Sequence, residues 1–271
     1  MMGKNAYYAK IAEVVKKHSG INIEEDKFYL FDSRLETLMQ DYGLKTIENL
    51  SEKLLANDNP KMIAGLIEAM TTHESLFFRD IKVFDQFKSE VLPKLITDKS
   101  ETKQLKVWSA ACSSGQEIYS VMIQMMENAN LRDFKYEVVA SDISEKIIAK
   151  AKQGEYTQFE VQRGMPISYL MKYFDNVGEI WKIQENIKAP ITFKQHNLIG
   201  NAASIGSDFD VVFMRNVLIY FDKSTKVMVL NNVHKSMRKG GFICVGTAEN
   251  VFGCESLFEP VPNTTCWFKS I

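Results

Sequence analysis

The first hundred residues of the chain carry apolar side chains at helical spacing. Apolar positions recur at i, i+3, i+4 and i+7 at Tyr8, Ile11, Ala12 and Val15. Gly20 ends this pattern. Further helices are predicted over residues 30–42, 46–56, 60–70 and 77–92, and Pro93 is expected to stop the last one. No alternation typical of a strand precedes residue 104, so this part is predicted to be all-α.

From residue 104 the pattern changes to short apolar runs that alternate with helical segments. Strands are predicted over residues 105–110, 136–140, 209–214 and 242–246. Helices are predicted over residues 116–126, 145–152, 167–174 and 224–237. Such alternation is typical of an α/β protein with a parallel, doubly wound sheet. Residues 266–268 are predicted to add an edge strand.

Residues 153–208 form a long insertion between the second and third strands. Its runs Ile180–Ile183 and Ile191–Phe193 are compatible with a small antiparallel hairpin, and a β-subdomain is placed at about 175–196. A turn is predicted at Lys239–Gly241, before the fourth strand. A polar segment at 96–104 is the expected boundary between a helical domain with its linking helix, 1–95, and the α/β domain, 96–271.

Composition and charge describe an ordinary globular protein. Apolar residues make up 45% and charged residues 25% of the chain. The net charge of −1 gives no general case for binding nucleic acid or an anionic membrane. No segment reaches the roughly 18 apolar residues of a membrane span, and the four cysteines show neither a C-x-x-C pair nor metal-ligand spacing. A soluble, cytoplasmic protein with reduced thiols is expected.

Small and polar residues follow the predicted strands, where open α/β sheets bind ligands. After the first strand, Ser109–Glu117 is rich in small residues that let the backbone approach a ligand. It lacks G-x-G-x-x-G, so a dinucleotide site is poorly supported. A tight strand-to-helix turn with a serine cap explains the same residues, and both interpretations stay open.

Asp142 ends the second strand, where an acid is placed to accept hydrogen bonds from a ribose diol. The alternative is that Ser141 or Asp142 caps the following helix. The third strand is followed by Arg215, Asn216 and, slightly later, Tyr220, which is equally compatible with a core residue.

Gly246–Asn250 follows the fourth strand and is interpreted as a polar turn. No Ser-His-Asp or Cys-His combination is indicated by its local context.

Taken together, five segments resemble the motifs of the chemotaxis receptor methyltransferases, the CheR family. They are TTHESLFFRD, VWSAACSSGQEIYS, VVASDISEKIIAKAKQGEY, FDVVFMRNVLIYFDK and GGFICVGTAEN. The resemblance covers nearly the whole chain. It implies an all-α N-terminal domain and a Rossmann-like S-adenosylmethionine domain with a small antiparallel β-subdomain. It also implies methylation of glutamate side chains on the cytoplasmic helical bundle of chemoreceptors, giving γ-glutamyl methyl esters and S-adenosylhomocysteine.

The resemblance also assigns roles to individual residues. Cofactor contacts are implied for His73, Ser75, Arg79, Glu117, Asp142, Asn197, Leu198, Arg215 and Asn216. Arg79 and Tyr220 are implied to lie beside the reacting methyl group as catalytic residues, and no metal is expected. Well-studied members have Asn in place of His73 and Thr in place of Ser75. Both replacements keep a hydrogen-bonding group, so we expect cofactor binding to survive.

Partners and alternatives follow from the same comparison. Residues 175–196 are a few residues fewer than in members whose β-subdomain binds a tethering peptide at the receptor's C-terminus, so independence from such a tether is predicted. The expected protein is a monomer that binds no nucleic acid and does not insert into membranes. Two alternatives are a methyltransferase acting on another protein or a small molecule, and a cofactor-binding signalling module without turnover. Glu117, Asp142, Arg79 and Tyr220 together argue against the last.

Overall fold

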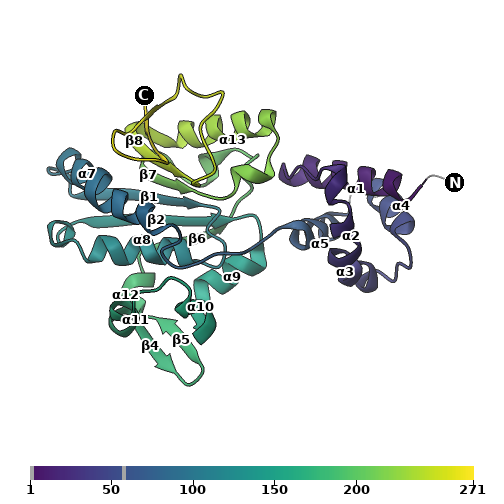
Figure 1. Ribbon diagram of the computed structural model, residues 1–271, viewed down its shortest axis with the longest axis horizontal. Helices are drawn as coiled ribbons and strands as arrows, with labels where there is room; N and C mark the ends of the chain where they lie inside the picture. The colour runs from purple at the N-terminus through teal and green to yellow at the C-terminus, as the bar shows by residue number, and fades with distance from the viewer. Residues whose placement is uncertain (1–2, 57–58) are drawn as a thin grey trace. The chain divides into compact units, whose positions relative to one another are not determined.

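The computed structural model describes residues 3–56 and 59–271 (Figure 1). Contacts between Cα atoms divide the chain into two compact units. The helical unit comprises the chain up to Thr72 together with Tyr220–Lys226, and the sheet unit comprises His73–Ile219 and Val227–Ile271. The contact division therefore falls between Thr72 and His73, whereas the boundary placed at 95/96 from sequence stays a prediction.

The helical unit contains the helices predicted before residue 71 in the predicted order, with one of them divided. They are α1 (Lys4–Ser19), α2 (Tyr29–Arg34), α3 (Glu36–Asp41), α4 (Ile47–Ala56) and α5 (Pro60–Met70), with a short 3-10 turn at Glu25–Lys27. Gly20 ends α1 in the left-handed conformation with φ 78°, which glycine adopts without steric cost. The side chain of Asn59 caps α5 and Pro60 stands in its first turn.

One predicted helix of this unit is divided in the structure. The segment expected to be continuous over 30–42 breaks at Leu35, where φ is −95° and ψ is −2°. Leu35 is fully buried in the core of the unit, so the two short helices present their apolar side chains from both sides of the break.

The sheet unit is built on a seven-stranded sheet in the order β6-β2-β1-β7-β8-β10-β9 (Figure 1). The strands are β1 (Gln104–Ala110), β2 (Lys135–Asp142), β6 (Ile191–Gln195), β7 (Phe209–Met214), β8 (Met237–Val245), β9 (Phe258–Pro260) and β10 (Trp267–Ser270). The first five strands of the sheet order are mutually parallel. This confirms the α/β class, and burial on both faces explains why the central strands are rich in apolar residues.

The helices of the sheet unit precede the first strand or connect the strands that follow. They are α6 (Ile81–Gln86), the π-helical turn η2 (Phe87–Val91), α7 (Leu92–Asp98), α8 (Gln116–Met126), α9 (Glu145–Gln153), α10 (Gln158–Gln162), α11 (Ile167–Tyr173), α12 (Glu185–Lys188) and α13 (Lys223–Ser236), the first residues of which are grouped with the helical unit. Short 3-10 turns lie at Ala129–Leu131, Ala202–Ser204 and Leu218–Tyr220, the last labelled η5.

Pro93 does not stop the helical segment, contrary to the sequence prediction. The N–H of Leu92 donates to the carbonyl of Phe87, five residues earlier, so a π turn precedes the proline. Pro93 then falls in the first turn of α7, where a backbone N–H is not needed. The Phe87 ring stacks on Trp267 at 5.4 Å, which anchors this segment to the sheet.

The hairpin predicted from Ile180–Ile183 and Ile191–Phe193 is wrong. The first run is β5 (Ile180–Ile183), the middle strand of a separate small sheet between β4 (Phe174–Val177) and β3 (Glu155–Thr157). Gly178, with φ 69°, lies in the two-residue turn that joins β4 to β5. The second run belongs to β6, which pairs in parallel with β2 at the edge of the large sheet.

Two further details at the C-terminal side of the sheet differ from expectation. The last strand, β10, lies between β8 and β9 rather than at the edge. The turn expected at Lys239–Gly241 is an irregularity inside β8, because the register with β7 jumps from Phe209–Met237 to Val211–Phe242. Gly240 with φ 76° allows this jump without ending the strand.

Candidate active site

The carboxyl ends of four neighbouring parallel strands meet at one edge of the sheet. In the sheet order these are β6, β2, β1 and β7. The segments that follow them carry most of the residues singled out from sequence. The site is therefore placed where the topology of an open α/β sheet favours ligand binding.

The loop between β1 and α8 has an unusual backbone. Ala111, Ser113 and Gly115 have φ of 101°, 49° and 92°, values that side chains rarely adopt. The N–H groups of Ala111 and Cys112 both donate to the carbonyl of Ser141, each at 2.9 Å. Gly115 precedes α8 and no side-chain cap is present there, so the serine-cap interpretation does not hold. The loop keeps small side chains against a constrained backbone, which favours a ligand-facing role.

Asp142, at the end of β2, holds this loop. Its Oδ2 accepts the N–H of Ser113 at 2.9 Å, and its Oδ1 accepts the N–H of Ser144 at 3.2 Å. Ser144 caps α9 by accepting the N–H of Ile147, so the alternative that Asp142 or Ser141 is the cap is wrong. Burial raises the pKa of Asp142, and the N–H groups of Ser144 and Ser113 oppose that rise. Each carboxylate oxygen retains a further lone pair for a ligand donor.

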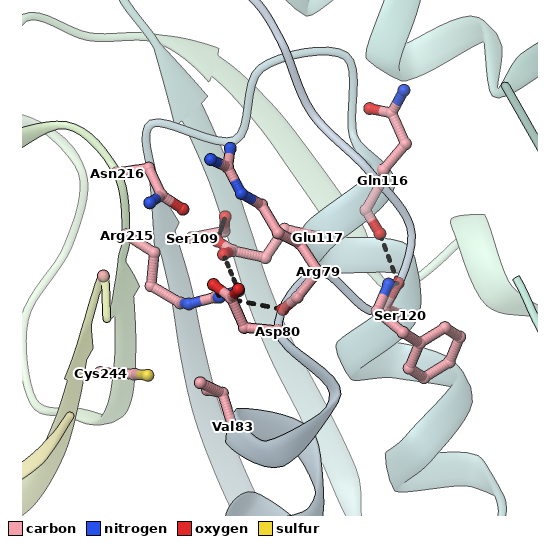
Figure 2. A network of polar contacts seen from close by, with 12 residues as sticks. Arg79, Asp80, Val83, Ser109, Gln116, Glu117, Ser120, Arg215, Asn216 and Cys244 are labelled. Carbon is pink, nitrogen blue, oxygen red and sulfur yellow. Dashed lines mark hydrogen bonds and ion pairs between the residues drawn. The ribbon is translucent and has the colours of Figure 1, made fainter. Parts of the chain in front are cut away.

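Glu117 stands in the first turn of α8 and faces β1 and β7. Its Oε1 accepts the hydroxyl of Ser109 at 3.0 Å, and its Oε2 accepts Nη1 of Arg215 at 3.2 Å. Figure 2 shows these groups together. Burial raises the pKa of Glu117, and the positive charge of Arg215 opposes this effect. The carboxylate is thus held in place by two protein donors and retains acceptor capacity.

Arg215 connects Glu117 to the segment that contains Arg79. Its side chain is 1% exposed, and its Nη2 donates to the Arg79 carbonyl at 2.9 Å and to Asp80 Oδ2 at 2.7 Å (Figure 2). Burial by itself lowers the pKa of Arg215, but the charges of Glu117 and Asp80 outweigh it and raise the pKa. Its Nε is buried without a hydrogen-bond partner among the residues that the structure describes. Cofactor contact by Arg215 stays a prediction, whereas its contacts with the protein are direct.

The backbone around Arg79 is constrained on both sides. Phe78 and Asp80 have φ of 47° and 60°. The N–H of Phe78 donates to Ser120 Oγ at 3.0 Å. Arg79 itself is half-buried, and Figure 2 shows its side chain extending away from the guanidinium of Arg215. Such a strained, multiply held loop is typical of functional positions.

The remaining predicted cofactor residues border the same edge. The His73 carbonyl accepts the hydroxyl of Ser113 at 3.0 Å, and Ser75 is half-buried on the same segment. Asn197 follows β6 and accepts the N–H of Ile199 through Oδ1 at 3.3 Å, while Leu198 is buried. Their cofactor contacts stay predictions.

Two residues after β7 complete the predicted set. Asn216 has a left-handed backbone with φ 57°. Tyr220 ends η5 and is grouped with the helical unit, where its carbonyl accepts the N–H of Asn22 at 2.8 Å. Tyr220 is therefore not among the residues brought together in the sheet unit, and its catalytic role stays a prediction.

Sequence reasoning missed Glu249. The segment Gly246–Asn250 was interpreted as a polar turn, yet the Glu249 carboxylate accepts three backbone N–H groups. They belong to Gly246 at 2.6 Å, Asn216 at 2.8 Å and Ile219 at 3.1 Å. An acid shortly after a buried strand was the available signal, but two of its three partners lie 30 and 33 residues away in sequence.

Other site chemistries find no support in the described residues. No group of three or more histidine, cysteine or acidic side chains there has the geometry of a metal site. The four cysteines are buried and unpaired, as predicted. Within residues 3–56 and 59–271, no helix combines the length and apolar character needed to cross a bilayer.

The donor and acceptor set fits S-adenosylmethionine. Its ribose diol and its ammonium group need acceptors, and Asp142 and Glu117 are carboxylates with lone pairs not used by the protein. The small-residue loop 109–116 lets the backbone come close without a phosphate-binding glycine pattern. These features match a ligand without phosphates.

Comparisons with known proteins agree with this assignment. The family model described as CheR methyltransferase, SAM binding domain, matches residues 73–267, and the CheR methyltransferase, all-alpha domain, matches residues 6–71. Chemotaxis protein methyltransferase Cher2 of Pseudomonas putida is 35% identical over 95% of this chain and 94% of its own length. Chemotaxis protein methyltransferase 1 of Pseudomonas aeruginosa is 37% identical over 92% of each chain. Similarity of this extent covers both units.

Proposed function

Because the chain belongs to the CheR methyltransferase family, whose cofactor is S-adenosylmethionine, we propose that it methylates glutamate side chains of chemoreceptors. The products are γ-glutamyl methyl esters and S-adenosylhomocysteine. The observation that carries this proposal is the Arg215 guanidinium, which binds both Glu117 and the backbone of Arg79. One side chain thereby fixes a proposed cofactor anchor relative to the residue proposed to hold the substrate.

When bound, S-adenosylmethionine supplies an electrophilic methyl group on a positively charged sulfur. In this proposal Asp142 binds the ribose and Glu117 binds the amino acid end, while Asn197, Leu198, Arg215, Asn216, His73 and Ser75 border the remainder. The substrate carboxylate has a reference pKa of about 4.3 and is ionised at neutral pH. A general base is therefore not needed, and the chain's work is binding, orientation and exclusion of water.

Arg79 is proposed to hold the substrate carboxylate. A guanidinium binds a carboxylate in a defined orientation through charge-assisted hydrogen bonds. Tyr220 is proposed to donate a hydrogen bond nearby without adding charge. Orientation of this kind contributes roughly 7–11 kcal/mol in favourable cases. Because the reaction neutralises two opposite charges, a site with little water favours it.

The receptor interaction is proposed to be direct and independent of a C-terminal tether peptide. The small sheet has strands of three or four residues, and a two-residue turn joins β4 to β5. Its edges therefore offer few backbone groups to an added peptide strand. Titration with the isolated receptor tail peptide tests this point, and micromolar affinity would contradict it. The enzyme is further proposed to be a cytoplasmic monomer.

One assay distinguishes the proposal from its alternatives. The purified protein is incubated with methyl-labelled S-adenosylmethionine and membranes that contain chemoreceptors, and methanol released by base is counted. Glutamyl methyl esters are base-labile, so label released as methanol from the receptor band supports the proposal. Base-stable label or label on another molecule indicates a different methyltransferase. Cofactor binding without any transfer indicates a signalling module.

A further inference from the structure

The carboxylate of Glu249 joins the loops that follow β7 and β8. Its Oε2 accepts the N–H groups of Gly246 at 2.6 Å and Asn216 at 2.8 Å. Its Oε1 accepts the N–H of Ile219 at 3.1 Å. The Glu249 N–H in turn donates to the Gly246 carbonyl at 2.8 Å, which fixes the backbone that carries the side chain. Charge-assisted bonds of this type are stronger than bonds between neutral groups.

The backbone at Asn216 needs such support. Its φ of 57° lies in the left-handed region, which a residue with a side chain occupies at an energetic cost. Three residues later, Ile219 stands in the short 3-10 turn η5, where backbone N–H groups lack partners within the helix. The two oxygens of Glu249 supply the acceptors for both positions.

Gly246 is shaped to admit this carboxylate. A Cβ at Gly246 would lie 2.6 Å from Glu249 Oε2 and 3.0 Å from both Asn216 N and Asn216 Nδ2. Any larger residue would therefore displace the carboxylate, the Asn216 backbone, or both. The absence of a side chain at Gly246 therefore provides the space that the Glu249 carboxylate occupies.

We propose that Glu249 is a positioning residue for the methyl transfer. Its Oε2 holds Asn216 at the cofactor site, and its Oε1 holds Ile219, the residue directly before Tyr220. This inference rests on the proposed function, which assigns Asn216 to the cofactor and Tyr220 to the reaction. Glu249 itself touches neither the cofactor nor the substrate in this proposal.

The variant Glu249→Gln tests the contact made by Oε1 separately from the contacts made by Oε2. Glutamine retains one acceptor oxygen, which satisfies the paired N–H groups of Gly246 and Asn216, and its amide NH₂ then faces the Ile219 N–H. We expect the affinity for S-adenosylhomocysteine, measured by calorimetry, to stay within about twofold of wild type because the Asn216 contact is retained. We expect kcat per cofactor-binding site to fall roughly 10-fold or more, because small misplacements of reacting groups are costly.

Gly246→Ala tests the other oxygen. The added methyl group displaces Oε2 and Asn216, so S-adenosylhomocysteine should bind roughly 10-fold more weakly. Glu259→Gln is the matched control, since Glu259 is an exposed residue of β9 whose ion pair with Lys269 measures 3.5 Å. The control should retain wild-type affinity and kcat. Normalising kcat by the calorimetric number of sites removes the contribution of unfolded protein.

Each result of these measurements supports or overturns the role proposed for Glu249. A fall in kcat per site in Glu249→Gln with retained affinity supports the proposal, whereas wild-type kcat per site overturns it. If Glu249→Gln does not fold, the Gly246→Ala affinity decides, and unchanged affinity overturns the proposal. If the wild-type protein methylates no receptor, the proposed function fails, but the affinity measurement on Gly246→Ala still tests whether Glu249 positions Asn216.

Discussion

The guanidinium of Arg215 donates to the backbone carbonyl of Arg79 at 2.9 Å. The bond links the end of a central strand to the segment before α6, which carries the residue proposed to hold the substrate. Because the acceptor is a backbone atom, any residue at position 79 retains this bond. Substitution of Arg215 therefore tests the placement of this segment, and substitution of Arg79 tests the role of the Arg79 side chain.

Arg215→Ala is expected to destabilise the fold strongly. It leaves the Glu117 carboxylate, whose side chain is 13% exposed, without its cation, together with the more exposed carboxylate of Asp80. Loss of one partner of a buried pair costs about 3–5 kcal/mol. Chemical denaturation measures the change. Arg215→Lys is the matched variant, since it retains the charge but cannot make the same forked contacts. If the alanine variant were as stable as wild type, the network would have no structural role.

Arg79→Ala is expected to lower methyl transfer while leaving the fold intact. Loss of the orienting guanidinium should reduce kcat roughly 100-fold, and Tyr220→Phe should reduce it about 10-fold through loss of one hydrogen bond. Circular dichroism and S-adenosylhomocysteine titration accompany the rate measurement. Arg132→Ala, at an exposed position, is the control. Full activity of Arg79→Ala would remove Arg79 from the reaction.

Acidification is expected to weaken cofactor binding at a pH above the ordinary carboxyl range. Burial raises the folded-state pKa of Asp142 above its ordinary value of 3.8, so the proton is bound more tightly in the folded protein. The stability contributed by this group is therefore fully present below 3.8 and is lost as the pH rises through the raised pKa. The cofactor is bound by the ionised carboxylate of Asp142. Its affinity therefore falls as the pH falls, whereas the stability contributed by this group rises.

Calorimetric titration of S-adenosylhomocysteine across pH measures this dependence. Glu117, whose pKa is also raised by burial, should contribute in the same direction. Asp142→Ala should weaken binding roughly 100-fold at neutral pH, since hydrogen bonds to charged groups contribute about 1.5–3 kcal/mol each. An affinity that is constant down to the ordinary carboxyl pKa would contradict the raised value.

Asp222 is expected to stabilise the helical unit at neutral pH and not in acid. The ion pair with Lys16, at 2.7 Å, is the largest cause of the lowered pKa of Asp222, and the hydrogen bond from the Thr225 N–H, at 2.8 Å, adds to the effect. Because the folded pKa is lowered, the stabilisation is present above the ordinary value of 3.8 and is lost as the pH falls through the lowered pKa. Asp222→Ala should cost about 1 kcal/mol, as for loss of a helix cap. A ΔG difference between variant and wild type that does not change with pH would contradict this.

The sequence carried strong signals for the parallel sheet, since β1, β2 and β7 each contain a short apolar run that is followed by small or polar residues. Pairing of short strands was not predictable in the same way. β4 follows α11 without a break, so the start of this strand was hidden in the end of a predicted helix. The continuation past Pro93 depended on a π turn, which has no simple sequence pattern.

For the site, residue type and strand position were enough to single out Asp142, whose alternative as a helix cap was excluded only by the contact of Ser144 with Ile147. Arg215 was singled out from the sequence, but its contact with the carbonyl of Arg79 was not. A backbone carbonyl is present at every residue, so the residue types do not indicate which one accepts the hydrogen bond. Glu249 was missed for a similar reason, because all its partners are backbone N–H groups.

The segment Tyr220–Lys226 belongs by its contacts to the helical unit, although it is encoded after most of the sheet unit. Ile21 and Phe221 form an antiparallel bridge there, next to the ion pair of Lys16 with Asp222. A fragment that ends at Thr72 would lack these partners. A gene divided between the two matched domains would therefore not encode two self-sufficient proteins, because the helical half would lose the contacts that Tyr220–Lys226 makes with it.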